Sequence, residues 1–113
     1  MHEFSMVQEV MRVLKKSAAE NNISRIKTVR LVVGKLAAVL PDSMQFCFEI
    51  LAKEPPFVNT RLEIEEIDIR GRCRSCGKEF VIAGYRFNCA CCGSPAVEVV
   101  AGNELYVDYY EGE

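Results

Sequence analysis

Two C-x-x-C-G motifs, with twelve residues between the last cysteine of the first and the first cysteine of the second, constrain the fold of this chain more than any other feature of its sequence. They read CRSCG at residues 73–77 and CACCG at residues 89–93. Two residues between paired cysteines let both sulfurs approach one ion at about 2.3 Å, and four thiolates complete the tetrahedron that Zn²⁺ prefers. We therefore predict one structural zinc site whose ligands are Cys73, Cys76, Cys89 and Cys92.

The second motif holds a third cysteine, so its two ligands have to be chosen. Pairing Cys89 with Cys92 reproduces the spacing of the first motif and places a glycine after the second cysteine, where a turn can require positive φ. Pairing through Cys91 would leave a single residue between the ligands and strain a shared site. We interpret Cys91 as a spare thiol and an alternate ligand. Cys47 lies far from both motifs in an apolar stripe, which predicts a buried core thiol.

Other cysteine chemistries fit this pattern less well. A thioredoxin-like redox pair needs a single C-x-x-C motif at the start of a helix, whereas here two motifs lie among glycines. A catalytic zinc ion keeps an open coordination position, and four thiolates leave none. The chain has one histidine, His2, and no pattern that pairs a nucleophile with a base. We predict that the protein is not an enzyme.

The composition predicts a soluble globular protein of the cytoplasm. Of the 113 residues, 50% are hydrophobic and 27% are charged, a balance typical of a folded domain. No apolar run approaches the roughly 20 residues needed to cross a bilayer. The chain also shows no secretory leader, so its cysteines are expected to be reduced metal ligands. We predict no membrane contact.

The charge of the chain argues against a polyanionic partner. The net charge is −2 and the pI is about 5.5, whereas nucleic-acid-binding domains usually have a pI above about 9. Basic residues do lie near the motifs, and they either offset the negative charge of a four-thiolate zinc ion or bind nucleic acid. They are Arg70, Arg72, Arg74, Lys78 and Arg86. We predict no nucleic-acid partner and keep a zinc-ribbon module that binds nucleic acid or protein as the alternative function.

Apolar residues at helical spacing predict two helices. The first stripe comprises Val7, Val10, Met11, Leu14 and Ala18, and its helix should end near Asn21. The second stripe comprises Met44, Cys47, Phe48 and Leu51, and it stops before Pro55. Asp42 is expected to cap this second helix, with Gln45 as its capping-box partner.

Segments rich in β-branched and apolar residues predict strands at residues 26–33, 60–70, 97–100 and 105–110. Because strands flank the cysteine-rich segment on both sides, the final strand is expected to return to the N-terminal sheet. We predict an α+β fold with a discontinuous first domain at residues 1–70 plus 97–113 and an inserted zinc-ribbon-like domain at residues 71–96. Exchange of the final strand is geometrically compatible with a homodimer, so both monomer and homodimer stay open.

The N-terminus reads Met1-His2-Glu3 and offers a second metal-binding arrangement. A free α-amine on Met1, the backbone nitrogen of His2 and the His2 imidazole can chelate one ion, with a fourth position for Glu3 or a partner. Such nitrogen-rich coordination favours Ni²⁺ or Cu²⁺ over Mg²⁺ or Ca²⁺. Taken alone, a histidine at the second position is usually just a terminal residue.

The combination of motifs over the whole chain resembles the HypA family of hydrogenase nickel-incorporation proteins. The resemblance rests on Met1-His2-Glu3, Val33-Gly34, the two C-x-x-C-G motifs with Ser94 after the second, and Gly102-Asn103-Glu104-Leu105. One departure is the second motif, where relatives commonly have proline and a non-cysteine residue in place of Ala90-Cys91.

The resemblance implies a metallochaperone that carries nickel to the maturing [NiFe]-hydrogenase large subunit together with the GTPase HypB. In some relatives it implies a role with urease maturation proteins as well. Carried over to this chain, His2 is the nickel-site histidine, Met1 supplies the terminal nitrogen and Glu3 lies next to the metal. The cysteine motifs hold structural Zn(II). The implied fold has two helices on a three-stranded sheet in the Ni(II)-binding domain, plus a zinc domain.

Overall fold

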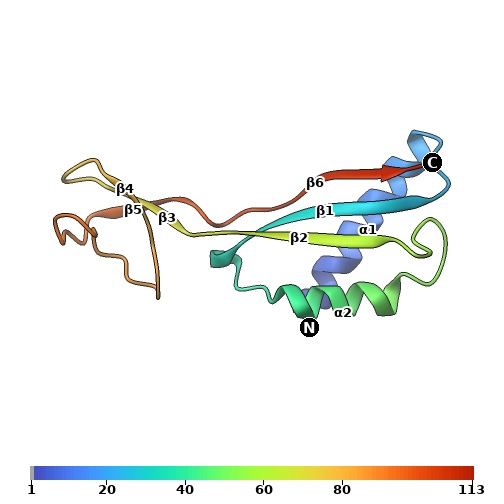
Figure 1. Ribbon diagram of the computed structural model, residues 1–113, viewed down its shortest axis with the longest axis horizontal. Helices are drawn as coiled ribbons and strands as arrows, with labels where there is room; N and C mark the ends of the chain where they lie inside the picture. Colours follow the sequence, from blue (N-terminus) through green and yellow to red (C-terminus); the bar gives the residue numbers. More distant parts are fainter. Residues whose placement is uncertain (1) are drawn as a thin grey trace. The chain divides into compact units, whose positions relative to one another are not determined.

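The structure is a computed structural model that describes residues 2–113 (Figure 1). The chain divides into two compact units, each made of segments that are separate in the sequence. The first unit comprises Met1–Val32, Val39–Glu65 and Tyr106–Glu113, and the second comprises Val33–Ala38 and Glu66–Leu105. The predicted zinc-binding domain at residues 71–96 falls within the second unit, which extends beyond it on both sides.

A three-stranded sheet with the order β2-β1-β6 forms the centre of the first unit. Its strands are β1 (Ile26–Gly34), β2 (Arg61–Ile67) and β6 (Leu105–Gly112). β6 runs antiparallel to β1, because the amide of Glu113 donates to the carbonyl of Arg25 at 2.9 Å and that of Gly34 to the carbonyl of Glu104 at 2.7 Å. The prediction that the final strand returns to the N-terminal sheet is confirmed (Figure 1).

The two predicted helices are confirmed as α1 (His2–Glu20) and α2 (Pro41–Leu51). They contact each other, and most residues of their apolar stripes are buried in the core of the first unit, whereas Val10, Met11 and Leu51 are half-buried. From the helices this core takes Val7, Leu14, Ala18, Met44, Cys47 and Phe48, and from β1 it takes Val29 and Leu31. Cys47 is only 2% exposed, which confirms the core thiol expected from its place in the stripe.

The start of α2 differs from the prediction. The helix begins two residues earlier than expected, at Pro41, with Leu40 in place of Asp42 as its N-cap and no side-chain cap hydrogen bond. Proline suits the first helical position because its missing N–H would have no partner there. The expected capping-box residue, Gln45, instead donates from Nε2 to the carbonyl oxygen of Leu62 at 2.6 Å and so ties α2 to β2.

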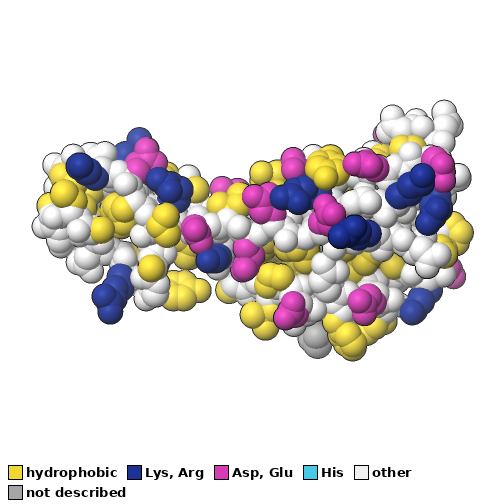
Figure 2. Space-filling model, in the orientation of Figure 1, with side chains coloured by type: hydrophobic (Ala, Val, Ile, Leu, Met, Phe, Trp, Pro, Cys, Tyr) yellow, Lys and Arg dark blue, Asp and Glu magenta, His cyan; other side chains and the backbone are white. Residues whose placement is uncertain are grey.

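Arg30 lies between the buried Val29 and Leu31 on β1, so strand alternation directs it to the opposite face of the sheet. Its guanidinium group meets carboxylates from both neighbouring strands, at 2.8 Å from Glu65 on β2 and 3.6 Å from Asp108 on β6. Figure 2 shows this alternation of cationic and acidic side chains over the sheet of the first unit. Because these groups are solvent-exposed, each pair contributes little to stability.

A second three-stranded sheet, with the order β4-β3-β5, belongs to the second unit. Its strands are β3 (Arg70–Cys73), β4 (Glu79–Val81) and β5 (Val97–Ala101), and β3 is antiparallel to both neighbours. The strand predicted at residues 60–70 is confirmed over Arg61–Ile67, but its continuation to residue 70 is wrong, because the chain breaks after Ile67 and enters the second sheet at Arg70. No described helix combines the length and the hydropathy needed to span a membrane.

Two glycine backbones pack directly against each other in the second unit. A Cβ atom on Gly34 would overlap the carbonyl group of Gly102, and one on Gly102 would lie 2.6 Å from the Cα atom of Ile69. The amide of Leu36, in the 3₁₀ turn η1 (Lys35–Ala37), donates to the carbonyl of Gly102 at 2.8 Å. Gly34 is the last residue of β1 and lies where only a glycine leaves room for the crossing chain.

We expect Gly34→Ala to destabilise the protein by about 3 kcal/mol or more, because the added methyl group has no space. Gly34 has φ −79° and ψ 143°, which any residue adopts, so the loss would report the steric clash and not backbone strain. Urea unfolding followed by far-UV circular dichroism measures it. An unchanged unfolding midpoint would show that the two backbones do not need this close approach.

Candidate metal centre

The first cysteine knuckle, residues 73–78, follows directly from β3. The carbonyl of Cys73 accepts from the amide of Gly77 at 2.9 Å, and the amide of Cys73 donates to the carbonyl of Lys78 at 2.9 Å. Gly77 has φ +76°, a left-handed conformation that L-residues adopt only with strain. The chain thus turns back on itself within one motif and directs both cysteine side chains to the same side.

The second knuckle, residues 89–94, repeats this geometry. The carbonyl of Cys89 accepts from the amide of Gly93 at 2.9 Å, and the amide of Cys89 donates to the carbonyl of Ser94 at 2.9 Å. Gly93 has φ +76°, the same value as its counterpart in the first knuckle. The C-x-x-C-G spacing that the sequence repeats is therefore one local structure used twice.

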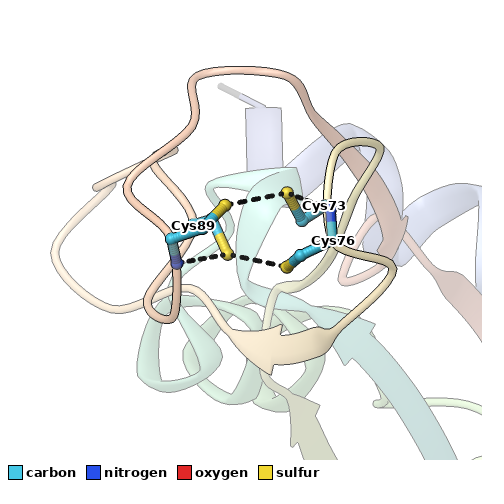
Figure 3. Close-up of side chains that lie close together, drawn as sticks. Cys73, Cys76 and Cys89 are labelled. Atoms are coloured by element: carbon cyan, nitrogen blue, oxygen red, sulfur yellow. Dashed lines mark hydrogen bonds between the residues drawn. The ribbon is translucent and has the colours of Figure 1, made fainter.

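The two knuckles bring four sulfurs together. The Sγ atoms of Cys73, Cys76, Cys89 and Cys92 all lie within 4.8 Å of one another. The Cys73–Cys92 and Cys76–Cys89 sulfur pairs are each 3.6 Å apart (Figure 3). A tetrahedral Zn²⁺ ion with metal–sulfur bonds of about 2.3 Å separates its ligands by about 3.8 Å. The donor set and its spacing fit such an ion.

Backbone amides stabilise the first thiolate of each knuckle. The Cys73 sulfur accepts from the amides of Ser75 at 3.3 Å and Cys76 at 3.4 Å. These bonds, the one from Cys76 above all, lower the pKa of Cys73 to about 6. Hydrogen bonds to the charged form favour ionisation. The amide of Cys92, and then that of Cys91, lower the pKa of Cys89 for the same reason.

The second thiol of the first knuckle behaves in the opposite way. The amide of Lys78 favours the thiolate of Cys76, but partial loss of solvent and the neighbouring sulfurs outweigh it and raise the pKa of Cys76 to about 12. Four anionic sulfurs in contact repel one another, so full ionisation requires a cation between them. A bound divalent ion supplies that charge, and a coordinated thiol is deprotonated outright.

Cys91 stands apart from the cluster. Its backbone amide donates to the sulfur of Cys89 at 3.3 Å, while its side chain is exposed and its sulfur is not among the four that converge. It occupies the position that Ser75 has in the first knuckle, since both amides bond the first sulfur of their motif. The choice of Cys92 over Cys91 agrees with this geometry.

The sequence did not predict the hydroxyl contacts that join the knuckles. The Oγ atom of Ser94 accepts from the amide of Ala96 at 3.1 Å and lies 3.0 Å from the Oγ atom of Ser75. Serine is common in loops, so only the three-dimensional arrangement reveals this contact. Nearby, Arg72 and Arg74 both pair with Glu98, at 3.2 Å and 3.5 Å, so one carboxylate offsets part of their charge within the chain.

The N-terminal residues proposed to bind nickel are described only in part. Met1 lies outside the described residues, as does the side chain of His2. The backbone of His2 begins α1, and Glu3 is half-buried in the first turn of that helix. The ligand arrangement expected at Met1-His2-Glu3 therefore stays a prediction.

Comparison with known proteins decides the family. The model of a family described as "Hydrogenase/urease nickel incorporation, metallochaperone, hypA" matches residues 1–112 of the chain. The chain belongs to the HypA family. Relatives from Moorella thermoacetica and Geobacter metallireducens, both named hydrogenase maturation factor HypA, are each 42% identical over 113 residues. Each alignment covers 100% of both proteins, so the resemblance extends over the whole length.

Solved structures of HypA proteins have the same fold. A solution structure of a HypA protein matches with a TM-score of 0.71 at 24% identity and covers 100% of this chain and 97% of its own. The solution structure of the Ni metallochaperone HypA from Helicobacter pylori matches with a TM-score of 0.66 at 23% identity, covering 97% and 96%. The predicted α+β fold, with two helices on a three-stranded sheet and a separate four-cysteine module, is confirmed.

We expect Gly77→Ala to weaken both folding and metal binding, because alanine at φ +76° costs about 1–2 kcal/mol even though an added methyl group meets no other atom. Gly84→Ala is the matched control, since Gly84 has φ +60° and equally open surroundings but lies outside the knuckles. Unfolding should show similar losses for both variants, whereas competition with a chromophoric chelator should show weaker metal binding only for Gly77→Ala. Equal affinities would contradict the role assigned to the turn.

Proposed function

We propose that this chain is a nickel metallochaperone that binds Ni(II) at its N-terminus and delivers it during maturation of [NiFe]-hydrogenase, while Zn(II) in the four-cysteine site has a structural role. The observation that carries this proposal is the match of residues 1–112 to a nickel-incorporation family. The converging cysteine knuckles support the zinc assignment. The function is one of binding and transfer, and no catalytic step is assigned to the chain.

Zinc is proposed as the resident metal because the four sulfurs leave no open coordination position. Cys73 and Cys89 are 1% and 4% exposed, so half of the ligand set is closed off from solvent. A closed, thiolate-only site suits a structural ion and does not suit a cargo that must leave. The small second unit has a modest apolar core, and small domains commonly depend on such a metal for stability.

Zinc binding gives a test that separates neighbouring thiols. Cys92→Ser removes a zinc ligand. Mutations of residues that only hydrogen-bond to a ligand lower metal affinity by about 10- to 100-fold, so this variant should lose more than about 100-fold in zinc affinity. Cys91→Ser is the matched control, and it should keep one zinc ion per chain with nearly unchanged affinity. Elemental analysis and chelator competition measure both. Loss of zinc from Cys91→Ser with retention in Cys92→Ser would reverse the ligand assignment.

The start of α1 favours the backbone nitrogen of His2 as a nickel ligand. The first N–H groups of a helix have no acceptor within the helix. Since α1 begins at His2, its amide can be deprotonated and bind a metal without breaking a helical hydrogen bond. The amine of Met1 and the imidazole of His2 would complete three nitrogen donors, a set that favours Ni²⁺ or Cu²⁺. An open fourth position would allow an acceptor to attack the ion.

The dipole of α1 opposes a cation at this position. The N-terminus of a helix carries the equivalent of about half a positive charge, which repels Ni²⁺. Negative charge from the deprotonated amide and from Glu3, in the first turn, offsets that repulsion. Glu3 is therefore proposed to stabilise the bound ion whether or not its carboxylate coordinates it.

Nickel titration by calorimetry tests the N-terminal site on untagged protein loaded with zinc. His2→Ala and an N-terminal extension should each abolish tight binding, and Glu3→Gln should weaken it, whereas Gln8→Ala on the exposed side of α1 should not. Since the imidazole must be neutral to bind, affinity should fall as the pH drops through about 6.5. If His2→Ala and the extended protein bind nickel like the parent, the N-terminal chelate is refuted.

The family description names hydrogenase and urease, which supports nickel delivery to these enzymes. We propose the hydrogenase large subunit as the acceptor, the GTPase HypB as the protein that acts with this chain, and urease maturation proteins as further partners. We propose that transfer takes place in the cytoplasm.

A further inference from the structure

An exposed aromatic loop connects β4 to the second cysteine knuckle. The term refers here to residues 83–87, with the sequence Ala-Gly-Tyr-Arg-Phe. In Figure 1 it lies in the orange part of the chain, and on the face drawn in Figure 2 hydrophobic and cationic side chains mark its tip. None of its residues belongs to the metal cluster or to the N-terminal site.

The backbone of this loop is strained at a tyrosine. Gly84 has φ +60° and Tyr85 has φ +57°, and the amide of Arg86 donates to the carbonyl of Ala83 at 3.2 Å. Positive φ at both central residues is the pattern of a type I′ turn, which favours glycine or asparagine at each. A bulky aromatic residue at this position is a conformational outlier, and such outliers often mark functional positions.

The side chains do not compensate for this strain by burial. Tyr85 is 64% exposed and Phe87 is 39% exposed, with their ring centroids 6.5 Å apart and their planes tilted by 45°. A third apolar side chain, that of Val81 at the end of β4, is 47% exposed. The ring of Tyr85 therefore contributes little to the core of its own chain, and glycine at position 85 would fit the turn better.

A hollow of about 360 Å³ lies beside the loop. Its walls include Phe80, Val81, Ala83 and Arg86, together with Cys89 and Ala90 of the second knuckle. No acidic side chain lines it, and the guanidinium group of Arg86 has no ion pair among the described residues. The hollow thus combines an apolar wall with one arginine that has no carboxylate partner among the described residues.

We infer that the aromatic loop and this hollow dock an acidic segment of a partner protein that carries an apolar side chain. The apolar side chain would fill the hollow against Val81 and Ala83, a carboxylate would pair with Arg86, and the ring of Tyr85 would cover the contact. Exposed tyrosine and arginine are the side chains that most often dominate protein interfaces. The partner would then touch the knuckle that holds Cys89, which places the contact at the metal module.

Nucleic acid fits this surface less well, although aromatic rings and arginine also bind single strands. The chain has a net charge of −2, and Arg72 and Arg74 are paired with Glu98. One free arginine in the hollow matches a carboxylate better than a polyphosphate backbone, which needs several cations. The docking site does not depend on the nickel site, so either proposal can fail while the other stands.

A fluorescein-labelled peptide of sequence EELFEE, titrated with the zinc-loaded full chain, tests the inference by anisotropy. It should bind, whereas KKLFKK and EESSEE should not. Arg86→Glu and Tyr85→Gly should each weaken binding by about tenfold or more. The matched controls Lys53→Glu and Tyr106→Ser, exposed positions on the first unit, should leave it unchanged.

Two further measurements keep the test independent of folding. Tyr85→Gly relieves the strained turn, so its thermal unfolding midpoint should not fall even as peptide affinity does. Amide NMR shifts on peptide addition should centre on residues 80–90. The inference is overturned if EELFEE does not bind, if it binds Arg86→Glu as well as the parent, or if a labelled oligouridylate binds this loop in its place.

Discussion

Four thiolates placed within contact of one another form the constraint on which the second unit depends. Their mutual repulsion cannot be relieved by the few amides that bond Cys73 and Cys89, so a cation has to lie between them. The apolar residues that back this cluster are few, with Ile69 and Ile82 among the buried ones. A metal ion bound by the four sulfurs would supply cohesion that a larger core would otherwise give, and the turns at Gly77 and Gly93 direct the sulfurs to one point.

The close contact between the backbones of Gly34 and Gly102 is a second constraint on the same unit. It brings the end of β1 and the segment before β6 into direct backbone contact, and the carboxylate of Glu104 accepts from the amide of Gly102 at 2.7 Å. Segments from three parts of the sequence are thereby held in one unit without a large core. Such packing depends on the absence of side chains, whereas the metal cluster depends on particular ones.

Local patterns predicted most of the fold, and pairings between distant segments account for what they missed. The apolar stripes around Leu14 and Phe48 and the repeated cysteine spacing are properties of short stretches of chain, so the helices and the cluster could be predicted. The break after Ile67 depends on which sheet each half joins, and no residue near it records that choice. Likewise, Gln45 bonds Leu62 across the fold, although its local context favours a helix cap.

The two knuckles are structurally equivalent, yet their outer sides differ. In one, Ser75 lies against Ser94, and in the other, Cys91 faces solvent at the same position. A single backbone fold of six residues thus appears twice in this molecule, with different side chains at its second, third and sixth positions: Arg74, Ser75 and Lys78 in the first knuckle and Ala90, Cys91 and Ser94 in the second. At the third position a hydroxyl and a thiol occupy the same place in the backbone fold, next to the same four sulfurs. An oxidant or a competing soft metal therefore meets an exposed thiol beside one knuckle and a hydroxyl beside the other.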